Sequence, residues 1–245
     1  MTVEVLAPAK LTLSLRVTGR RDNGFHLLDA EMVSLDLVDV LRIRSVAGTS
    51  SLRVVGPEGP RPTDPDDLVL RALAHCGRSA EVDLEKRIPA GAGLGGGSSD
   101  AAAVLRWAAG NDPAAADPVA AANLGADVPF CLRGGRARVR GIGEQLEHLP
   151  HVERTLTLLT PALHCSTPVV YRTWDELGGP TGVSGNDLEP AALAAYPELA
   201  DARDELAAAT GLQPRLAGSG STWFVEGDFP GPGRIVVHTT PALTI

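Results

Sequence analysis

The sequence predicts an α+β fold of two lobes, with mostly antiparallel sheets and packed helices. Apolar residues make up 44% of the 245 residues, which is enough to bury a sizeable core. Strand-like and helix-like segments come in blocks, whereas a parallel sheet would require strict alternation of the two. The length suits one large or two small domains. We expect an N-terminal domain over residues 1–150 and a shorter C-terminal domain over residues 151–245.

The first 90 residues are expected to be mainly strands. Apolar residues alternate with polar ones over residues 11–17, and a shorter strand is expected at 3–7. Residues 18–24 and 56–65 are rich in turn formers, so loops are expected there. Asp66 or Asp67 can cap a helix that ends near Cys76. Further strands are expected at residues 31–37, 40–45, 52–55 and 82–88.

Helices are expected to dominate the next 120 residues. A serine and aspartate cap is followed by a helix over residues 101–109, which Gly110 ends, and a short helix is expected at 114–122. Thr167-Pro168 opens another helix, and Asp187 caps a later one that Pro197 interrupts. Strands are expected at residues 136–140, 154–160, 215–217, 222–225 and 234–238.

Composition excludes several classes of function. A net charge of −8 argues against a protein whose main role is to bind nucleic acid, since such proteins carry clustered positive charge. No apolar run reaches the roughly 18 residues of a membrane span, and the N-terminus does not resemble a signal peptide. Three widely spaced cysteines suit a reducing cytoplasm, where we expect the protein. The six histidines are scattered, and His148 and His151 lack a third metal ligand.

Lysine is rare in this chain. Only Lys10 and Lys86 are lysine among 22 basic residues. Lysine is a compact point charge, whereas arginine carries a planar fork, so the two lysines stand out as candidates for special positions. Lys10 lies in an apolar strand, where it is either a functional cation or a side chain that extends its charge to solvent.

A glycine-rich loop precedes the helix expected near residue 101. Six of the seven residues from 91 to 97 are glycine or alanine, and Ser98, Ser99 and Asp100 follow. Such a backbone can approach a ligand closely, and the N–H groups at a helix start favour an anion. The loop is not a Walker A motif, because Gly97 rather than lysine follows Gly96. The spacing Gly91, Gly93, Gly96 resembles a dinucleotide fingerprint, but no strand is expected after the helix. We therefore expect a phosphate-binding loop of another type.

Two further clusters are ambiguous when taken singly. Asp127 lies in the apolar stretch 124–130, where an aspartate is often only a turn or helix cap. Residues 216–221 form a second loop of small residues after a strand.

Taken in order, these segments resemble the GHMP small-molecule kinases. The matching segments are Pro8-Ala9-Lys10-Leu11, Thr18 to His26, Lys86-Arg87-Ile88-Pro89 with the glycine-rich block to Asp100, Gly125-Ala126-Asp127-Val128-Pro129, Gly141-Ile142-Gly143-Glu144, Ser166-Thr167-Pro168, Asn186-Asp187-Leu188-Glu189 and Gly218-Ser219-Gly220. They extend through most of the chain, and both lysines fall inside them. The resemblance implies the two-lobed GHMP kinase fold and an ATP-dependent kinase that phosphorylates an alcohol group.

The resemblance also implies roles for individual residues. Asp127 would take the proton of the acceptor hydroxyl, and Lys10 would lie beside it and the moving phosphoryl group. Mg²⁺ would bind near Ser98 or Ser99. The residues expected to bind ATP are Asp67, Lys86, Pro89, Ala90, Gly91, Ala92, Gly93, Leu94, Gly95, Gly96, Gly97, Ser98 and Ser99. The residues expected to bind the acceptor are Thr12, Phe25, His26, Thr167, Gly218 and Ser219.

Within the family, the chain is most similar to members that phosphorylate 4-diphosphocytidyl-2-C-methyl-D-erythritol, giving the 2-phosphate, in the non-mevalonate route to isoprenoids. Phe25 and His26 would then hold the cytosine of a small molecule with a cytidine diphosphate group. The chain departs from those members at several places. Thr12 replaces an asparagine, Phe25 a tyrosine, Asp67 an asparagine near the adenine, and Val183-Ser184-Gly185 an aromatic, and the helix usual between the last strands has shrunk to residues 228–233.

Alternatives stay open at this point. The chain could be a diverged GHMP kinase that acts on another small polyol or polyol phosphate. A binding protein without catalysis would need neither Lys10 nor Asp127. The expected state is a monomer or homodimer.

Overall fold

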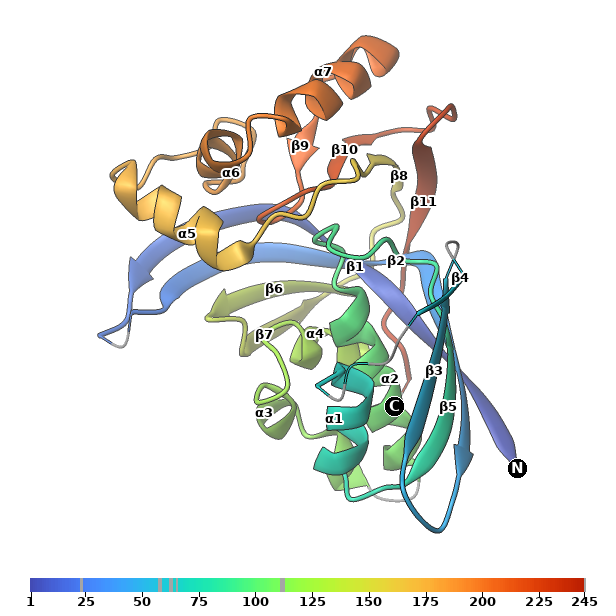
Figure 1. Cartoon of the computed structure of the whole chain (residues 1–245). Helices are drawn as coiled ribbons and strands as arrows, with labels where there is room; N and C mark the ends of the chain where they lie inside the picture. Colours follow the sequence, from blue (N-terminus) through green and yellow to red (C-terminus); the bar gives the residue numbers. More distant parts are fainter. Residues whose placement is uncertain (23, 57–58, 62–63, 65, 111–112, 245) are drawn as a thin grey trace.

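A long hairpin of two strands organises the molecule. The computed structural model describes residues 1–22, 24–56, 59–61, 64, 66–110 and 113–244. Strands β1 (Thr2–Arg20) and β2 (His26–Ser45) cross the whole molecule as one antiparallel pair (Figure 1). The prediction of separate short strands here was wrong. Register shifts after Pro8, Thr12 and Val17 absorb irregular residues, so both strands continue through them.

One mixed sheet of eleven strands is built on this hairpin in the described part of the chain. Strand β2 pairs with β1, β5, β6 and β11, and β11 also pairs with β8. Among the described strand pairs only β3 and β5 run parallel, so the predicted antiparallel character is confirmed. The other strands are β3 (Ser51–Gly56), β4 (Gly59–Arg61), β5 (Ala80–Glu85), β6 (Arg136–Gly141), β7 (Gln145–Leu149), β8 (Thr155–Leu159), β9 (Arg215–Leu216), β10 (Trp223–Glu226) and β11 (Arg234–Thr240).

The helices lie in two groups on either side of the hairpin (Figure 1). The first group comprises α1 (Leu68–His75), α2 (Gly96–Ala109), the 3₁₀ helix η1 (Pro113–Ala116), α3 (Pro118–Ala121) and α4 (Val128–Arg133). The second comprises α5 (Thr167–Glu176), α6 (Glu189–Ala195) and α7 (Leu199–Thr210). Across the described ranges, no helix is long and apolar enough to span a membrane.

Several element boundaries differ from the predictions. Helix α2 begins at Gly96, so Ser98, Ser99 and Asp100 lie in its first turns and do not cap it. Strand β5 ends at Glu85 rather than residue 88. The Lys86 N–H still donates to the Val55 carbonyl of β3, but the N–H groups of Arg87 and Ile88 donate to the Asp39 carboxylate instead of a neighbouring strand. Asp187 does not cap α6, since its carboxylate binds Arg16 and two backbone N–H groups.

Some elements were not expected from the sequence. Strands β4 and β7 and helix α4 are additions, and the helix expected at 114–122 divides into η1 and α3 because Asp117 caps the latter. Of the loops predicted at 18–24 and 56–65, residues 23, 57–58, 62–63 and 65 lie outside the described residues, as do residues 111–112 of the segment after α2.

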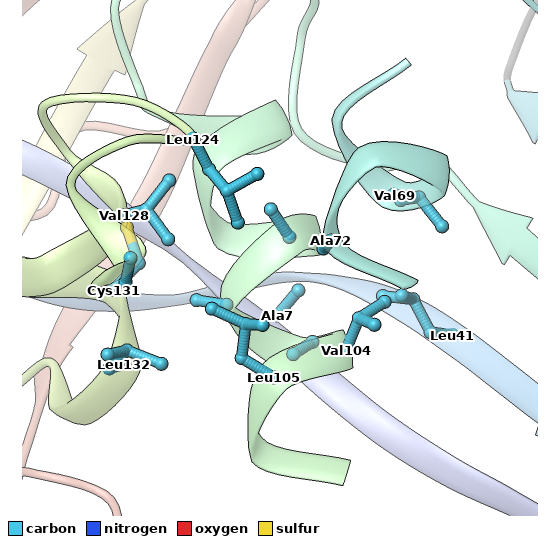
Figure 2. Packing of buried hydrophobic residues seen from close by; sticks show 14 of the residues in the cluster. Ala7, Leu41, Val69, Ala72, Val104, Leu105, Leu124, Val128, Cys131 and Leu132 are labelled. Carbon is cyan, nitrogen blue, oxygen red and sulfur yellow. The ribbon is translucent and has the colours of Figure 1, made fainter. Parts of the chain in front are cut away.

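Helix α2 packs at the centre of the largest apolar cluster. Its small residues Ala101, Ala102 and Ala103 are fully buried on different sides of the helix, which packs against β1, α1 and α4. Figure 2 shows residues of α4 on one side of α2 and residues of α1 and β2 on the other. A second cluster joins α5, α6 and α7 to Leu15 and Ala30 of the hairpin. The hairpin therefore contributes to both clusters, and the site described below lies along it.

Candidate active site

A cavity of about 1270 Å³ lies where the hairpin meets the glycine-rich loop and the two groups of helices. Its walls come from β1, the tip of the hairpin, the starts of α1, α2 and α4, helix α5 and the loop before β10. Of the site residues predicted from the sequence, the cavity is lined by Lys10, Thr12, Phe25, His26, Asp67, Lys86, Pro89, Ala90, Gly91, Ala92, Gly93, Leu94, Gly95, Gly96, Gly97, Ser98, Asp127, Thr167, Gly218 and Ser219. Ser99 is the exception.

Lys10 and Asp127 meet in this cavity. The Lys10 Nζ lies 3.3 Å from Asp127 Oδ2 and 3.3 Å from the Thr12 hydroxyl, and Lys10 is only 6% exposed. Asp127 occupies the N-cap position of α4, yet its side chain makes no capping hydrogen bond. The helix-cap interpretation of this aspartate is therefore wrong. Its carboxylate instead faces a buried cation and the cavity, as a proton acceptor for a phosphoryl acceptor would need to do.

Hydrogen bonds fix the glycine-rich loop on both sides. The Lys10 N–H of β1 donates to the Leu94 carbonyl at 2.9 Å. On the other side, the Thr222 hydroxyl and N–H donate to the Ala92 carbonyl at 2.8 and 3.2 Å. The loop that precedes β10 therefore holds the glycine-rich loop against β1, and the free backbone groups at the start of α2 are presented to the cavity.

Two glycines in the loop are required by space and by backbone conformation. Gly93 has φ +75°, and a Cβ there would lie 2.4 Å from the Gly220 carbonyl oxygen. Gly95 has φ +69°, and a Cβ there would lie 2.6 Å from Lys10 Cγ. Larger residues would strain the backbone and push apart the elements that form the cavity.

We expect Gly93→Ala to weaken ATP binding, because the new methyl group collides with the rigid Gly220 backbone rather than with a flexible side chain. The KM for ATP should rise by about tenfold or more, which corresponds to roughly 1.4 kcal/mol. Gly110→Ala is the matched control, since Gly110 has an ordinary φ of −56° and its Cβ would meet its nearest neighbour at 3.5 Å. Equal ATP kinetics in both variants would place the nucleotide elsewhere.

The two serines of the loop differ in what they can bind. Ser98 is half-buried and lines the cavity. Ser99 is fully buried, and its hydroxyl donates to the Pro8 carbonyl at 2.7 Å. The expectation that Ser99 contacts phosphate or Mg²⁺ is not met, because its hydroxyl holds α2 against β1 instead.

Lys86 is held beneath the loop by two carboxylates. Its Nζ contacts Asp39 and lies 2.7 Å from Asp100 Oδ2. Burial alone lowers the pKa of Lys86, but the two carboxylates outweigh this and raise it. Lys86 also lines the cavity, so its predicted contact with ATP stays a prediction, while its ammonium group pairs with Asp39 and Asp100.

The Asp100 carboxyl makes the stability of the folded state depend on pH. Burial raises the pKa of its carboxyl to about 7, and the Asp39 carboxylate adds to the rise against the pull of Lys86. Between its ordinary pKa of 3.8 and about 7, the folded state therefore holds a proton on Asp100 that the unfolded state has lost, so the contribution of this group to stability falls as pH rises through that range.

Asp100→Asn should remove this dependence. Melting temperatures measured from pH 5 to pH 8 should fall more steeply in the wild type than in the variant, because asparagine carries no charge at either pH. Parallel curves would mean that Asp100 does not titrate in this window.

The end of the cavity near the hairpin tip has an aromatic wall, formed by the predicted residue His26 and by Tyr171 of α5, which the sequence did not predict. The His26 ring stacks on Tyr171 at 4.7 Å, and Trp174 meets it edge-on at 5.5 Å. The His26 Nε2 lies 2.8 Å from Asp175 Oδ1. Phe25 is 59% exposed at the rim of the cavity.

Helix α5 supplies cavity-lining residues that the sequence did not single out. Pro168, Tyr171, Arg172 and Asp175 all line the cavity. Their spacing of three, four and seven residues places them on one face of the helix. That spacing was the available signal, but nothing in the sequence alone says that this face meets the hairpin tip.

The remaining predicted residues lie where backbone elements converge. The Thr167 and Ser219 hydroxyls are 2.9 Å apart, which joins α5 to the loop before β10. The Asn186 side chain donates to the Leu216 and Gly218 carbonyls and so fixes that loop. Asp67 caps α1 through the Val69 N–H.

Known proteins show the same sequence pattern and fold. Residues 67–135 match the family model described as GHMP kinases N terminal domain. A 4-diphosphocytidyl-2-C-methyl-D-erythritol kinase of Paracoccus denitrificans is 42% identical, covering 89% of this chain and 84% of that protein. The corresponding kinase of Ruegeria pomeroyi is 39% identical, covering 96% and 91%.

Solved structures agree. A crystal structure of 4-(cytidine 5'-diphospho)-2C-methyl-D-erythritol kinase superposes with a TM-score of 0.76 at 34% identity, covering 97% of this chain and 99% of that one. A homoserine kinase from Cytophaga hutchinsonii, at 19% identity and a TM-score of 0.62 over 98% and 95% of the two chains, shares the fold. The level and extent of these matches establish that the chain belongs to the 4-diphosphocytidyl-2-C-methyl-D-erythritol kinase family, within the GHMP kinases.

Proposed function

We propose that the protein transfers the terminal phosphoryl group of ATP to the 2-hydroxyl of 4-diphosphocytidyl-2-C-methyl-D-erythritol, in isoprenoid precursor biosynthesis. The observation that carries the proposal is the Lys10–Asp127 pair, whose Nζ and Oδ2 atoms are 3.3 Å apart. The pair lies in a cavity that the glycine-rich loop also lines. Relatives at about 40% identity over most of the chain carry the name of this activity.

The two ends of the cavity suit two different ligands. At one end the start of α2 presents backbone N–H groups, and the apolar side chains of Val54, Leu68 and Leu84 line the wall. This combination suits the phosphates and the base of ATP. At the other end, His26 and Tyr171 offer a planar aromatic surface to a pyrimidine ring. Burial raises the pKa of Tyr171, so its hydroxyl stays protonated and able to donate.

The catalytic step needs a proton acceptor and positive charge between these ends. Asp127 accepts the proton of the acceptor hydroxyl, which makes the oxygen a better nucleophile. Lys10 holds that carboxylate in place and faces the negative charge of the phosphoryl group as it moves. Phosphoryl transfer depends mainly on such positioning and electrostatic stabilisation. The Thr12 hydroxyl lies 3.3 Å from Lys10 Nζ and helps to orient it.

Mg²⁺ fits the site as an ion carried by the nucleotide. The described residues include no group of three or more acidic, histidine or cysteine side chains that could form a metal site of their own. Mg²⁺ is commonly held by substrate phosphates with few protein ligands. Ser98, which lines the cavity, is the residue that would complete such a site. When bound, the ion would neutralise phosphate charge during transfer.

The loss of the aromatic residue at 183–185 does not leave the base without a stacking surface. Tyr171 of α5 stacks on His26 and supports its ring from a different element. Val183, in the segment where the aromatic is missing, is 95% exposed and contributes no ring. The stacking surface at His26 therefore supports a cytidine-containing acceptor over a polyol without a base.

The test is a panel of hydroxyl acceptors with the purified protein and Mg-ATP. ADP release should be stoichiometric with phosphorylation of 4-diphosphocytidyl-2-C-methyl-D-erythritol, and phosphorus NMR should show a new phosphate ester on the 2-hydroxyl. Homoserine and mevalonate should give only background turnover. Faster turnover of another polyol or polyol phosphate would replace this proposal with a diverged GHMP kinase.

A further inference from the structure

Four cationic side chains line the cavity, and three of them are paired with carboxylates. Lys10 pairs with Asp127, Arg20 with Asp175 at 3.4 Å, and Lys86 with Asp39 and Asp100. The fourth is Arg172. Within the residues that the structure describes, Arg172 has no ion pair, although most other arginines of this chain do.

Arg172 stands on the cavity face of α5. It follows Tyr171 of the aromatic wall and precedes Asp175 by three residues, and all three line the cavity. The Asp175 carboxylate is shared by Arg20 and by His26, which lies 2.8 Å from it. The Asp175 carboxylate is thus already paired, and Arg172 stands beside the aromatic wall as a cation without an ion pair among the described residues.

We propose that the Arg172 guanidinium binds the diphosphate bridge of the acceptor substrate. A planar guanidinium donates two parallel hydrogen bonds to phosphate oxygens, which no neutral side chain of this wall can match. A base held at Tyr171 places the diphosphate that follows it next to the neighbouring residue on the same helix face. The inference rests on the proposed function, because it assumes an acceptor with a nucleoside diphosphate group.

The inference predicts a loss that depends on the phosphates of the ligand. Arg172→Gln should raise the Kd of cytidine diphosphate, measured by calorimetry, by about tenfold or more, since hydrogen bonds to charged groups are among the stronger ones. The Kd of cytidine, which lacks phosphate, should stay within twofold of the wild type. The KM of the acceptor should rise in parallel, while kcat and the KM of ATP stay nearly constant.

Two further variants make the test specific. Arg172→Lys keeps the positive charge but loses the planar guanidinium with its two parallel N–H donors. Its Kd for cytidine diphosphate should therefore lie between those of the wild type and Arg172→Gln. Arg203→Gln on α7 is the matched control, because it removes an arginine that does not line the cavity. It should bind cytidine diphosphate as the wild type does. Circular dichroism of each variant checks that the fold is intact.

The outcomes separate this inference from the proposed function. Wild-type affinity for cytidine diphosphate in Arg172→Gln would overturn the role of Arg172, even if the wild type phosphorylates the proposed acceptor. An equal loss for cytidine and cytidine diphosphate would also overturn it, since Arg172 would then only support the wall. A wild-type protein that binds neither ligand and does not turn over the acceptor would overturn the proposed function with it.

Discussion

Asp127→Asn should lower kcat by about 10²–10⁴-fold, the usual effect of removing a general base. The amide has nearly the same shape as the carboxylate but cannot accept the proton of the acceptor hydroxyl. Because the Asp127 side chain makes no capping hydrogen bond to α4, the melting temperature should change little. Steady-state kinetics with saturating Mg-ATP and acceptor measure the effect directly.

A matched aspartate controls for the substitution itself. Asp117 caps α3 through the Val119 N–H and lies outside the cavity. Asp117→Asn should keep wild-type turnover, because asparagine is an equally good cap. If Asp127→Asn also kept wild-type turnover, Asp127 would be no more than a structural residue.

Lys10→Met should be the second most damaging change. Methionine retains the apolar stem that packs near Gly95 but lacks the ammonium that faces Asp127. Removing one group that stabilises transition-state charge commonly costs about 10²–10³-fold in kcat. The melting temperature should change far less than turnover, because Asp127 can be solvated from the cavity once its partner is gone.

Kinetics and thermal melting of the same preparation distinguish the two roles of Lys10. A catalytic role predicts a large loss of kcat in a protein that still folds. A strongly lowered melting temperature with normal specific activity would show that Lys10 is retained for stability instead.

The sequence predicted most residues that line the glycine-rich end of the cavity. Gly91 to Ser98 form a contiguous segment, and a glycine-rich stretch before a helix has a local physical meaning. Even here, Ser99 was misplaced. Neighbouring residues in the first turn of a helix point in different directions, so only Ser98 faces the cavity and Ser99 faces the Pro8 carbonyl.

The acceptor end could not be predicted in the same way. Tyr171 and His26 are 145 positions apart in the chain, and the hairpin tip meets α5 only because the strands continue through three register shifts. The sequence prediction ended strands at residues 7 and 17, beside two of these irregular positions, and placed the third inside a strand. Likewise, the pairing of Lys86 with Asp39 depends on how β2 and β5 align, which no local pattern encodes.

The central claim is that this cavity selects a cytidine-containing acceptor and places its hydroxyl at Asp127. The most direct test is the ratio of kcat/KM for 4-diphosphocytidyl-2-C-methyl-D-erythritol to that for 2-C-methyl-D-erythritol 4-phosphate, in the wild type and in His26→Ala. We predict a strong preference for the cytidylyl substrate in the wild type, largely lost in the variant, because His26 forms the aromatic wall with Tyr171. Equal kcat/KM values for the two acceptors in the wild type would contradict the account.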